Sequence, residues 1–254
     1  MTTKSITSPM TEDQSRSIIQ LVSEVGGEAL NHLGLDRGRA QGLIENAGDF
    51  KRSIREPLTE VIRQYIRTNP WWFVKDWFAE WQRFYRDNFN REVDFSHVPL
   101  SAPRPGFDWP VMMAPGLTLN EVWTRCKDRF PCYSFIGDDL DAAVTFNERT
   151  PEKAYAVGFR GRVEADEENK GFSANDLVTR KVSSIVLRER CVMELWYNEV
   201  TGGGHLDIKR STLCAGSRDS GGDVPSADWC GGEFRVGYYR PDDASDYLRS
   251  RSVV

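Results

Sequence analysis

The sequence has 254 residues, of which 39% are hydrophobic and 28% are charged, and its formal net charge is −5 at pH 7. This length allows one large domain or two modest ones, and the acidic balance argues against nucleic acid as a partner. Neither an apolar run of about 18 residues nor the apolar core of a signal peptide occurs. We therefore expect no membrane span and a cytoplasmic location.

The N-terminal part of the chain has the composition of a helical region. We predict a disordered tail over 1–10 and a helical domain over 11–90. Its first helix follows a capping residue at Thr11, and a second, short helix lies near 37–46. Apolar residues then recur at three- and four-residue spacing over 49–67, which predicts an amphipathic helix.

An aromatic helix closes this region. Asn69 and Pro70 are a suitable N-cap and first residue for a helix that runs to Phe89. One interpretation of its aromatic stripe is an adaptor surface for a partner helix or a membrane. We favour packing within the protein, because acidic residues balance the basic ones and leave no basic face for anionic lipid. The stripe consists of Trp77, Trp81, Phe84 and Tyr85.

A change of composition follows the aromatic helix. Five prolines lie between residues 90 and 117, as is typical of a connection between domains. We assign 91–108 to a proline-rich linker and 109–254 to a second domain. The fold class predicted for the whole chain is α+β.

The second domain alternates helical and strand-like segments. Thr118 and Glu121 match a capping box at the start of a helix that runs to Arg129, and Ser173 matches the cap of a short helix. A longer helix ends at the three glycines that begin with Gly202. Strands are predicted at 153–160, 211–214, 233–239 and 247–254, the last three separated by loops and mostly antiparallel.

No metal or cofactor site is predicted. The three histidines lie far apart, and Cys126 and Cys132 lack the second pair that a four-ligand zinc site requires. Cys214 and Cys230 are able to pair if their strands are neighbours, but in a reducing cytosol we expect free thiols. The acidic segments 138–141 and 164–170 are interpreted as a solvated turn and a solvated charged segment.

The C-terminal loops, 215–247, are the candidate site. They combine rigid aromatic residues with adaptable polar ones, a mixture that suits a binding surface better than a catalytic centre. No motif assembles a nucleophile, a base and an orienting group, so we name no catalytic residue. The candidate ligand-binding residues are Arg218, Asp219, Asp223, Trp229, Tyr238, Tyr239, Asp242 and Asp243.

Two resemblances bear on residues 109–254. The segments WPVMMAPGLTLNEVW, RVEADEENKGFSANDL, GGHLDIKRSTLCAGSRDS and EFRVGYYRPDDASDYLRSRSVV resemble a family of uncharacterised proteins of reduced-genome, candidate-phylum bacteria. That resemblance covers more than half of the chain and implies no activity.

The order of predicted elements is also similar to the C-type-lectin-like fold. The matching segments are Ala215–Arg218, Trp229–Phe234, Pro241–Asp243 and Leu248–Val253. The resemblance implies that the terminal loops form the ligand surface. The chain lacks the helix-opening R-L-P-T motif of sulfatase-modifying members, so their activity is not carried over.

From these observations we expect a non-catalytic recognition protein that binds through loops 215–247. The ligand would be a protein, a small molecule or a carbohydrate. One alternative is an enzyme with a carboxylate-based site, a hydrolase or a transferase. Another is an adaptor that acts through the aromatic helix 70–89.

Overall fold

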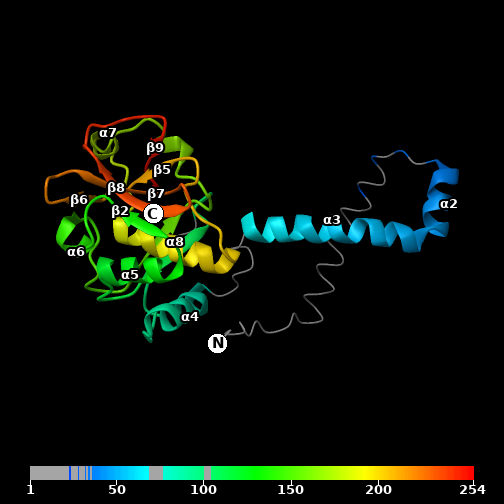
Figure 1. Cartoon of the computed structure of the whole chain (residues 1–254), viewed down its shortest axis with the longest axis horizontal. Helices are drawn as coiled ribbons and strands as arrows, with labels where there is room; N and C mark the ends of the chain where they lie inside the picture. The colour runs from blue at the N-terminus through cyan, green and yellow to red at the C-terminus, as the bar shows by residue number, and fades with distance from the viewer. Residues whose placement is uncertain are drawn as a thin grey trace. The chain divides into compact units, whose positions relative to one another are not determined.

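The computed structural model describes residues 36–68, 77–99 and 104–254, together with Ser23, Glu28, His32 and Gly34. The predicted tail over 1–10, the start of the helix after Thr11 and the Asn69–Pro70 helix start lie outside these residues. The chain divides into two units, Met1–Val61 and Ile62–Val254, with the division inside helix α3. The second unit holds helices and a mixed sheet (Figure 1), so the fold is α+β.

The described part of the first unit is helical. Helix α2 (Arg37–Glu45) begins at Asp36, whose side chain accepts a hydrogen bond from the Arg39 backbone N–H at 2.9 Å. Helix α3 (Ala47–Thr68) continues through Pro57. Both predicted helices are therefore confirmed, and α3 carries exposed apolar residues at helical spacing: Phe50, Ile54, Leu58 and Val61.

A five-stranded sheet is the centre of the second unit. Its strand order is β2-β8-β7-β5-β9. The central pairs β8–β7 and β7–β5 are antiparallel, whereas the outer strands β2 and β9 pair in parallel with their neighbours. The strands span Cys132–Ser134 (β2), Glu233–Tyr239 (β8), Val224–Cys230 (β7), Ser211–Leu213 (β5) and Leu248–Arg249 (β9).

Two small antiparallel sheets flank the central one. Strand β1 (Trp109–Met113) pairs with β4 (Tyr155–Phe159), and β3 (Val144–Asn147) pairs with β6 (Ser217–Asp219). The prediction of a strand at 153–160 is confirmed by β4. The short helices are α6 (Leu140–Ala143) and α7 (Ala174–Thr179), and a 3-10 turn spans Glu167–Asn169.

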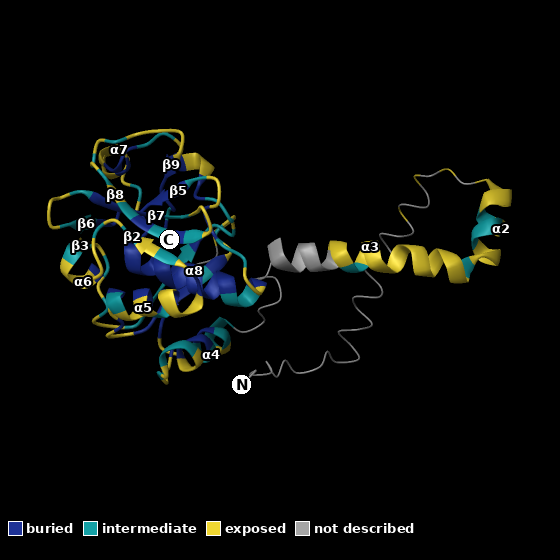
Figure 2. Ribbon diagram, viewed as in Figure 1, coloured by how far each residue is buried: buried dark blue, intermediate teal, exposed yellow. Residues whose placement is uncertain are grey.

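Helix α8 (Leu187–Thr201) is the buried axis of this unit. It contacts α5 (Leu119–Arg129), β7 and β1, and Figure 2 shows it buried along nearly its whole length. It ends at Gly202, which adopts the left-handed conformation with φ of 68° as predicted. A helix buried on all sides must satisfy its charged residues internally.

Helix α4 (Trp77–Phe89) packs its aromatic stripe inside the second unit. The Trp81 ring stacks on Trp196 with centroids 5.6 Å apart, and its Nε1–H donates to the Pro110 carbonyl at 2.8 Å. The Tyr85 hydroxyl donates to the Met112 carbonyl at 2.7 Å. The prediction that the stripe packs within the protein is confirmed, so the stripe is not a free adaptor surface.

The segment after α4 is packed rather than extended through solvent. Phe95 and Val98 are buried in the same hydrophobic core as the α4 stripe. The structure therefore joins α4 and the described residues 91–99 to the unit that contains the sheet. The contact division at Val61–Ile62 lies earlier in the chain than the proline-rich stretch 91–108 in which we expected a linker.

Local capping signals are confirmed. Thr118 forms a capping box at the start of α5, and Ser173 forms one at the start of α7.

Two local predictions are wrong. Residues expected to be loop before 233 include strands β6 and β7. In the segment 164–170, Asp166 is buried, and its carboxylate accepts hydrogen bonds from the side chain of Arg160 and the backbone N–H of Ser252.

Candidate functional site

Three predicted site residues lie on β6 or in the turn that follows it. The Arg218 guanidinium donates to the carbonyls of Ala215 and Ser217 at 2.8 and 2.7 Å, and burial lowers its pKa. The Asp219 carboxylate accepts from the backbone N–H groups of Gly221 and Asp223 at 2.8 and 2.9 Å. The Asp219 side chain therefore holds the turn between β6 and β7 in place, whereas Arg218 bonds to the backbone at the start of β6.

Trp229 lies on β7 and is half-buried. Its ring stacks on His205, with centroids 3.3 Å apart and an angle of 7° between the planes, and meets Phe130 edge-on at 6.0 Å. The side chain packs against the main hydrophobic core. The structure thus gives Trp229 extensive packing contacts.

The two remaining aspartates of the prediction lie in the turn after β8. The Asp243 carboxylate accepts from the Arg240 backbone N–H at 2.8 Å and so closes this turn. Asp242 is exposed. Neither residue lines a cavity described below.

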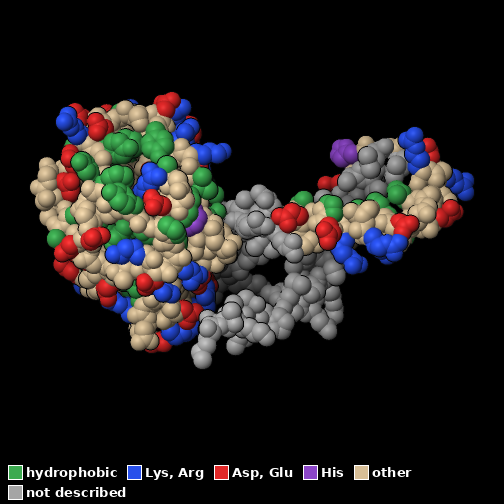
Figure 3. Space-filling model, in the orientation of Figure 1, with side chains coloured by type: hydrophobic (Ala, Val, Ile, Leu, Met, Phe, Trp, Pro, Cys, Tyr) green, Lys and Arg blue, Asp and Glu red, His purple; other side chains and the backbone are tan. Residues whose placement is uncertain are grey.

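Tyr238 and Tyr239 line a cavity of about 420 Å³ on the outer face of β7 and β8. In the space-filling view, hydrophobic side chains gather around charged ones over these strands (Figure 3). We call this cavity the tyrosine pocket. It is lined by Phe135, Ser226, Asp228, Cys230, Arg235, Gly237, Tyr238, Tyr239 and Tyr247.

Strand register explains why these residues meet. Ser226 is opposite Gly237, and Asp228 is opposite Arg235, in the antiparallel pair β7–β8. Because side chains alternate between the faces of a strand, these residues share one face, while Ala227 and its partner across the pair are buried on the other. Alternation therefore places Ser226, Asp228 and Arg235 on the face opposite to the one that Ala227 and Val236 bury in the main core.

Gly237 keeps the floor of the pocket open. A Cβ added there would lie 3.5 Å from the Ser226 Oγ and 3.7 Å from a ring carbon of Phe135, which are ordinary contact distances. Phe135 reaches this position because its backbone N–H donates to the Val236 carbonyl at 2.8 Å, directly after β2. A larger side chain at 237 would fill the pocket without a strained backbone.

Two opposite charges lie within the pocket. The Tyr247 hydroxyl donates to Asp228 Oδ2 at 3.1 Å. Burial, together with the negative charge of Asp228, raises the pKa of Tyr247, and burial followed by Asp228 and Asp243 raises the pKa of Tyr239. The Arg235 guanidinium lies 3.8 Å from Glu233. The pocket therefore offers a carboxylate, a guanidinium and phenol hydroxyls beside aromatic rings.

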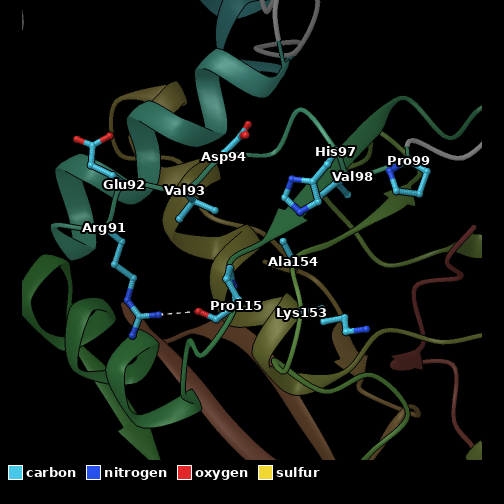
Figure 4. Close-up of a pocket in the computed structure, with 10 residues that line it drawn as sticks. All are labelled: Arg91, Glu92, Val93, Asp94, His97, Val98, Pro99, Pro115, Lys153 and Ala154. Atoms are coloured by element: carbon cyan, nitrogen blue, oxygen red, sulfur yellow. Dashed lines mark hydrogen bonds between the residues drawn. The ribbon is translucent and has the colours of Figure 1, made fainter.

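A second cavity, of about 840 Å³, lies between the segment after α4 and the start of β4. Figure 4 shows the Arg91 side chain directed toward Pro115, whereas the side chains of His97 and Lys153 lie apart from Arg91. Arg91 donates to the Pro115 carbonyl at 2.9 Å and pairs with Glu121 at 2.6 Å. The Arg91 charge is thus paired with a carboxylate of the protein itself. The rest of the cavity surface is mainly apolar.

A cluster of charges lies buried between α8 and the sheet. The Arg190 Nε–H donates to Asp207 at 2.8 Å and its Nη1–H to Glu194 at 2.7 Å. Arg251 donates to the other Asp207 oxygen at 2.7 Å, and His205 Nδ1 lies 2.8 Å from Glu194. We call these five residues the α8 ion network. Their charges are neutralised by one another, which suits a structural role.

The acidic segment 138–141 is solvated as predicted, since Asp138, Asp139 and Asp141 are exposed, and it also has a structural role. Asp139 caps α6 by accepting from the Ala142 backbone N–H at 3.0 Å. Asp141 accepts from the Leu119 and Asn120 backbone N–H groups at 2.9 and 3.0 Å, at the start of α5. Both carboxylates serve helix starts, where negative charge is stabilised.

Sequence reasoning located two of the nine residues that line the tyrosine pocket, Tyr238 and Tyr239. It missed Asp228 and Arg235, for which a signal existed: residues 226, 228 and 230 alternate along β7, and 235, 237 and 239 along β8. Tyr247 and Phe135 come from other elements. Over the described residues, no group of three or more His, Cys, Asp or Glu side chains is placed to hold a metal ion.

Comparison with known proteins gives no further assignment: no protein-family model, curated protein or solved structure matches this chain. In the part of the chain that the structure describes, every helix is too short or too polar to cross a lipid bilayer.

Proposed function

We propose that this protein is a non-catalytic recognition protein that binds its ligand in the tyrosine pocket. The observation that carries the proposal is the pocket itself. Its aromatic walls stand beside a few polar groups on a rigid strand pair, a combination typical of binding sites. Tyr238 and Phe135 are 51% and 58% exposed, so a ligand has apolar surface to cover.

The chemistry of the lining favours binding over catalysis. Asp228 is the single carboxylate among the nine lining residues, and none of them is a histidine. Hydrolysis by a pair of carboxylates requires two acidic groups across the reacting bond. The exposed thiol of Cys230 lacks a lining base that would activate it. These features support recognition of a small molecule, a carbohydrate or a protein side chain.

We also propose that the second unit is C-type-lectin-like. The order α5, β4, α8 and then the short C-terminal strands supports this relation, and the pocket draws most of its lining from residues 226–247. A cytoplasmic location belongs to the same proposal. It is supported by the five free cysteines, Cys126, Cys132, Cys191, Cys214 and Cys230.

The test is a ligand-observed NMR screen of the full chain with a mixed set of monosaccharides, amines, carboxylates and short peptides. At least one compound should bind the wild type and lose binding in Tyr238→Ala and in Gly237→Val, which fills the pocket floor. Phe146→Ala is the matched control, because Phe146 is 53% exposed on β3, away from the lining. If no compound distinguishes the pocket variants from the control, the proposed function is wrong.

A further inference from the structure

The surroundings of the tyrosine pocket are acidic. Residues 224–247 contain five carboxylates and two guanidinium groups. Burial raises the pKa of the Tyr239 phenol, and the negative charges of Asp228 and Asp243 raise it further. A negative field in a concave site favours a cationic ligand.

Asp228 retains capacity to bind a ligand. Among the described residues its carboxylate accepts a hydrogen bond from the Tyr247 hydroxyl, which lies 3.1 Å from Oδ2, whereas an ionised carboxylate has about four lone-pair sites. The residue is half-buried and lines the cavity. Its charge is therefore less screened than that of a carboxylate in bulk water.

The guanidinium in the pocket forms no ion pair with this carboxylate. Arg235 faces Asp228 across the strand pair, and both residues are described, yet no ion pair joins them. The Arg235 side chain instead reaches the hairpin turn, where a Cβ added at Gly231 would lie 2.5 Å from Nη2, and it pairs with Glu233 at 3.8 Å. Asp228 itself contacts Tyr247, whose hydroxyl donates to it.

Aromatic walls decide which kind of cation fits. The faces of phenol rings attract cations, and aromatic cages recognise quaternary ammonium groups in this way. A bare ammonium is strongly hydrated, so it loses more hydration in an apolar cage than a methylated one. Tyr238, Tyr239 and Tyr247 line the pocket together with its single carboxylate, Asp228.

We propose that the tyrosine pocket binds a methylated or quaternary ammonium group, with Asp228 as its counter-charge. The inference rests on the proposed function and names the ligand class of the same site. The group would be carried by a small molecule or by a methylated lysine of a peptide. The small molecule and the peptide would carry the same head group, so the experiment must distinguish these two sources.

The experiment titrates the full chain with choline and with 3,3-dimethyl-1-butanol, its uncharged isostere, by isothermal calorimetry. Choline should bind at least about tenfold more tightly than the isostere. Asp228→Asn keeps an acceptor for Tyr247 and should remove that advantage. Asp242→Asn removes the same charge from an exposed residue outside the lining and should leave it intact. Circular dichroism melting confirms that both variants fold.

Cys230 locates the bound cation. It is the exposed cysteine of the chain and lines the pocket, so saturating choline should slow its alkylation by iodoacetamide.

A short peptide with trimethyl-lysine is the second ligand. Tighter binding of the peptide than of choline identifies a peptide source, and the reverse identifies a small molecule; either result supports the ammonium site.

Two results would overturn the inference. If choline and its isostere bind equally, or Asp228→Asn binds choline as the wild type does, the pocket does not select for a cation. In that case, ligands from the NMR screen that are lost in Gly237→Val still uphold the proposed function. If choline fails to bind and no screened compound is sensitive to Gly237→Val, both proposals are wrong.

Discussion

Asp207 in the α8 ion network precedes β5, and Asp228 in the tyrosine pocket lies on β7. The surroundings of these two aspartates differ. Asp207 is fully buried and accepts hydrogen bonds from Arg190, Arg251 and the Thr212 hydroxyl. Asp228 is half-buried and accepts one from Tyr247. The first carboxylate is enclosed by cations, whereas the second faces a cavity.

The difference indicates which of the two carboxylates stabilises the fold and which is available to bind a ligand. A buried charge is tolerated only when partners replace its hydration, so the ion network is saturated by its own residues. A carboxylate at a cavity wall keeps part of its hydration and needs fewer partners. Incomplete pairing there leaves binding capacity that a ligand can use. The following substitutions test this contrast.

The largest effect is expected at Asp207. Asp207→Ala removes the shared partner of two buried guanidinium groups and should destabilise the fold by about 3–5 kcal/mol. Asp228→Ala, the matched control at the pocket, should change the free energy of unfolding by roughly 0.5 kcal/mol or less. Urea unfolding followed by tryptophan fluorescence measures both. Equal effects would mean that the pocket carboxylate is as structural as the buried one.

An intermediate effect is expected from crowding at a glycine. A Cβ at Gly216 would lie 2.7 Å from the Ser184 carbonyl oxygen and 2.9 Å from Val186 Cγ1. Gly216→Ala should therefore cost about 1–3 kcal/mol through overpacking. Gly237→Ala, in the open pocket floor, should be nearly neutral. The same urea titration compares them, and a neutral Gly216→Ala would show that the backbones of 184 and 216 separate easily.

The parts of the fold that depend on near neighbours in the chain were predictable. The capping boxes at Thr118 and Ser173 and the helix end at Gly202 involve residues a few positions apart, and the sequence shows them directly. Strand β7 was missed because Pro225, Ser226 and Asp228 have low strand propensity. It forms because β5 and β8 pair with it on both sides.

The same limit applies to the pocket and to the ion network. Tyr238 and Tyr239 were predicted from composition near the C-terminus. Phe135 joins them through the parallel pairing of β2 with β8, a register between segments far apart in the sequence. Asp207 and Arg251 meet Arg190 through the packing of α8 on the sheet, which no local pattern encodes. The pairing and packing of segments far apart in the sequence therefore decide which polar residues are buried in the core and which line the pocket.

The smallest effect on stability is expected at two neighbouring tyrosines. Tyr239 packs against the smaller hydrophobic cluster around Leu213 and Val224, so Tyr239→Ala should cost about 1 kcal/mol as its half-buried ring is lost. Tyr238 is 51% exposed, and Tyr238→Ala should lie within about 0.5 kcal/mol of the wild type. Both substitutions should nevertheless weaken ligand binding, since both rings line the pocket. Thermal melting and calorimetric titration of the same samples separate the two quantities. Loss of stability in Tyr238→Ala, with binding retained, would assign this face to the fold and leave the pocket without its exposed anchor.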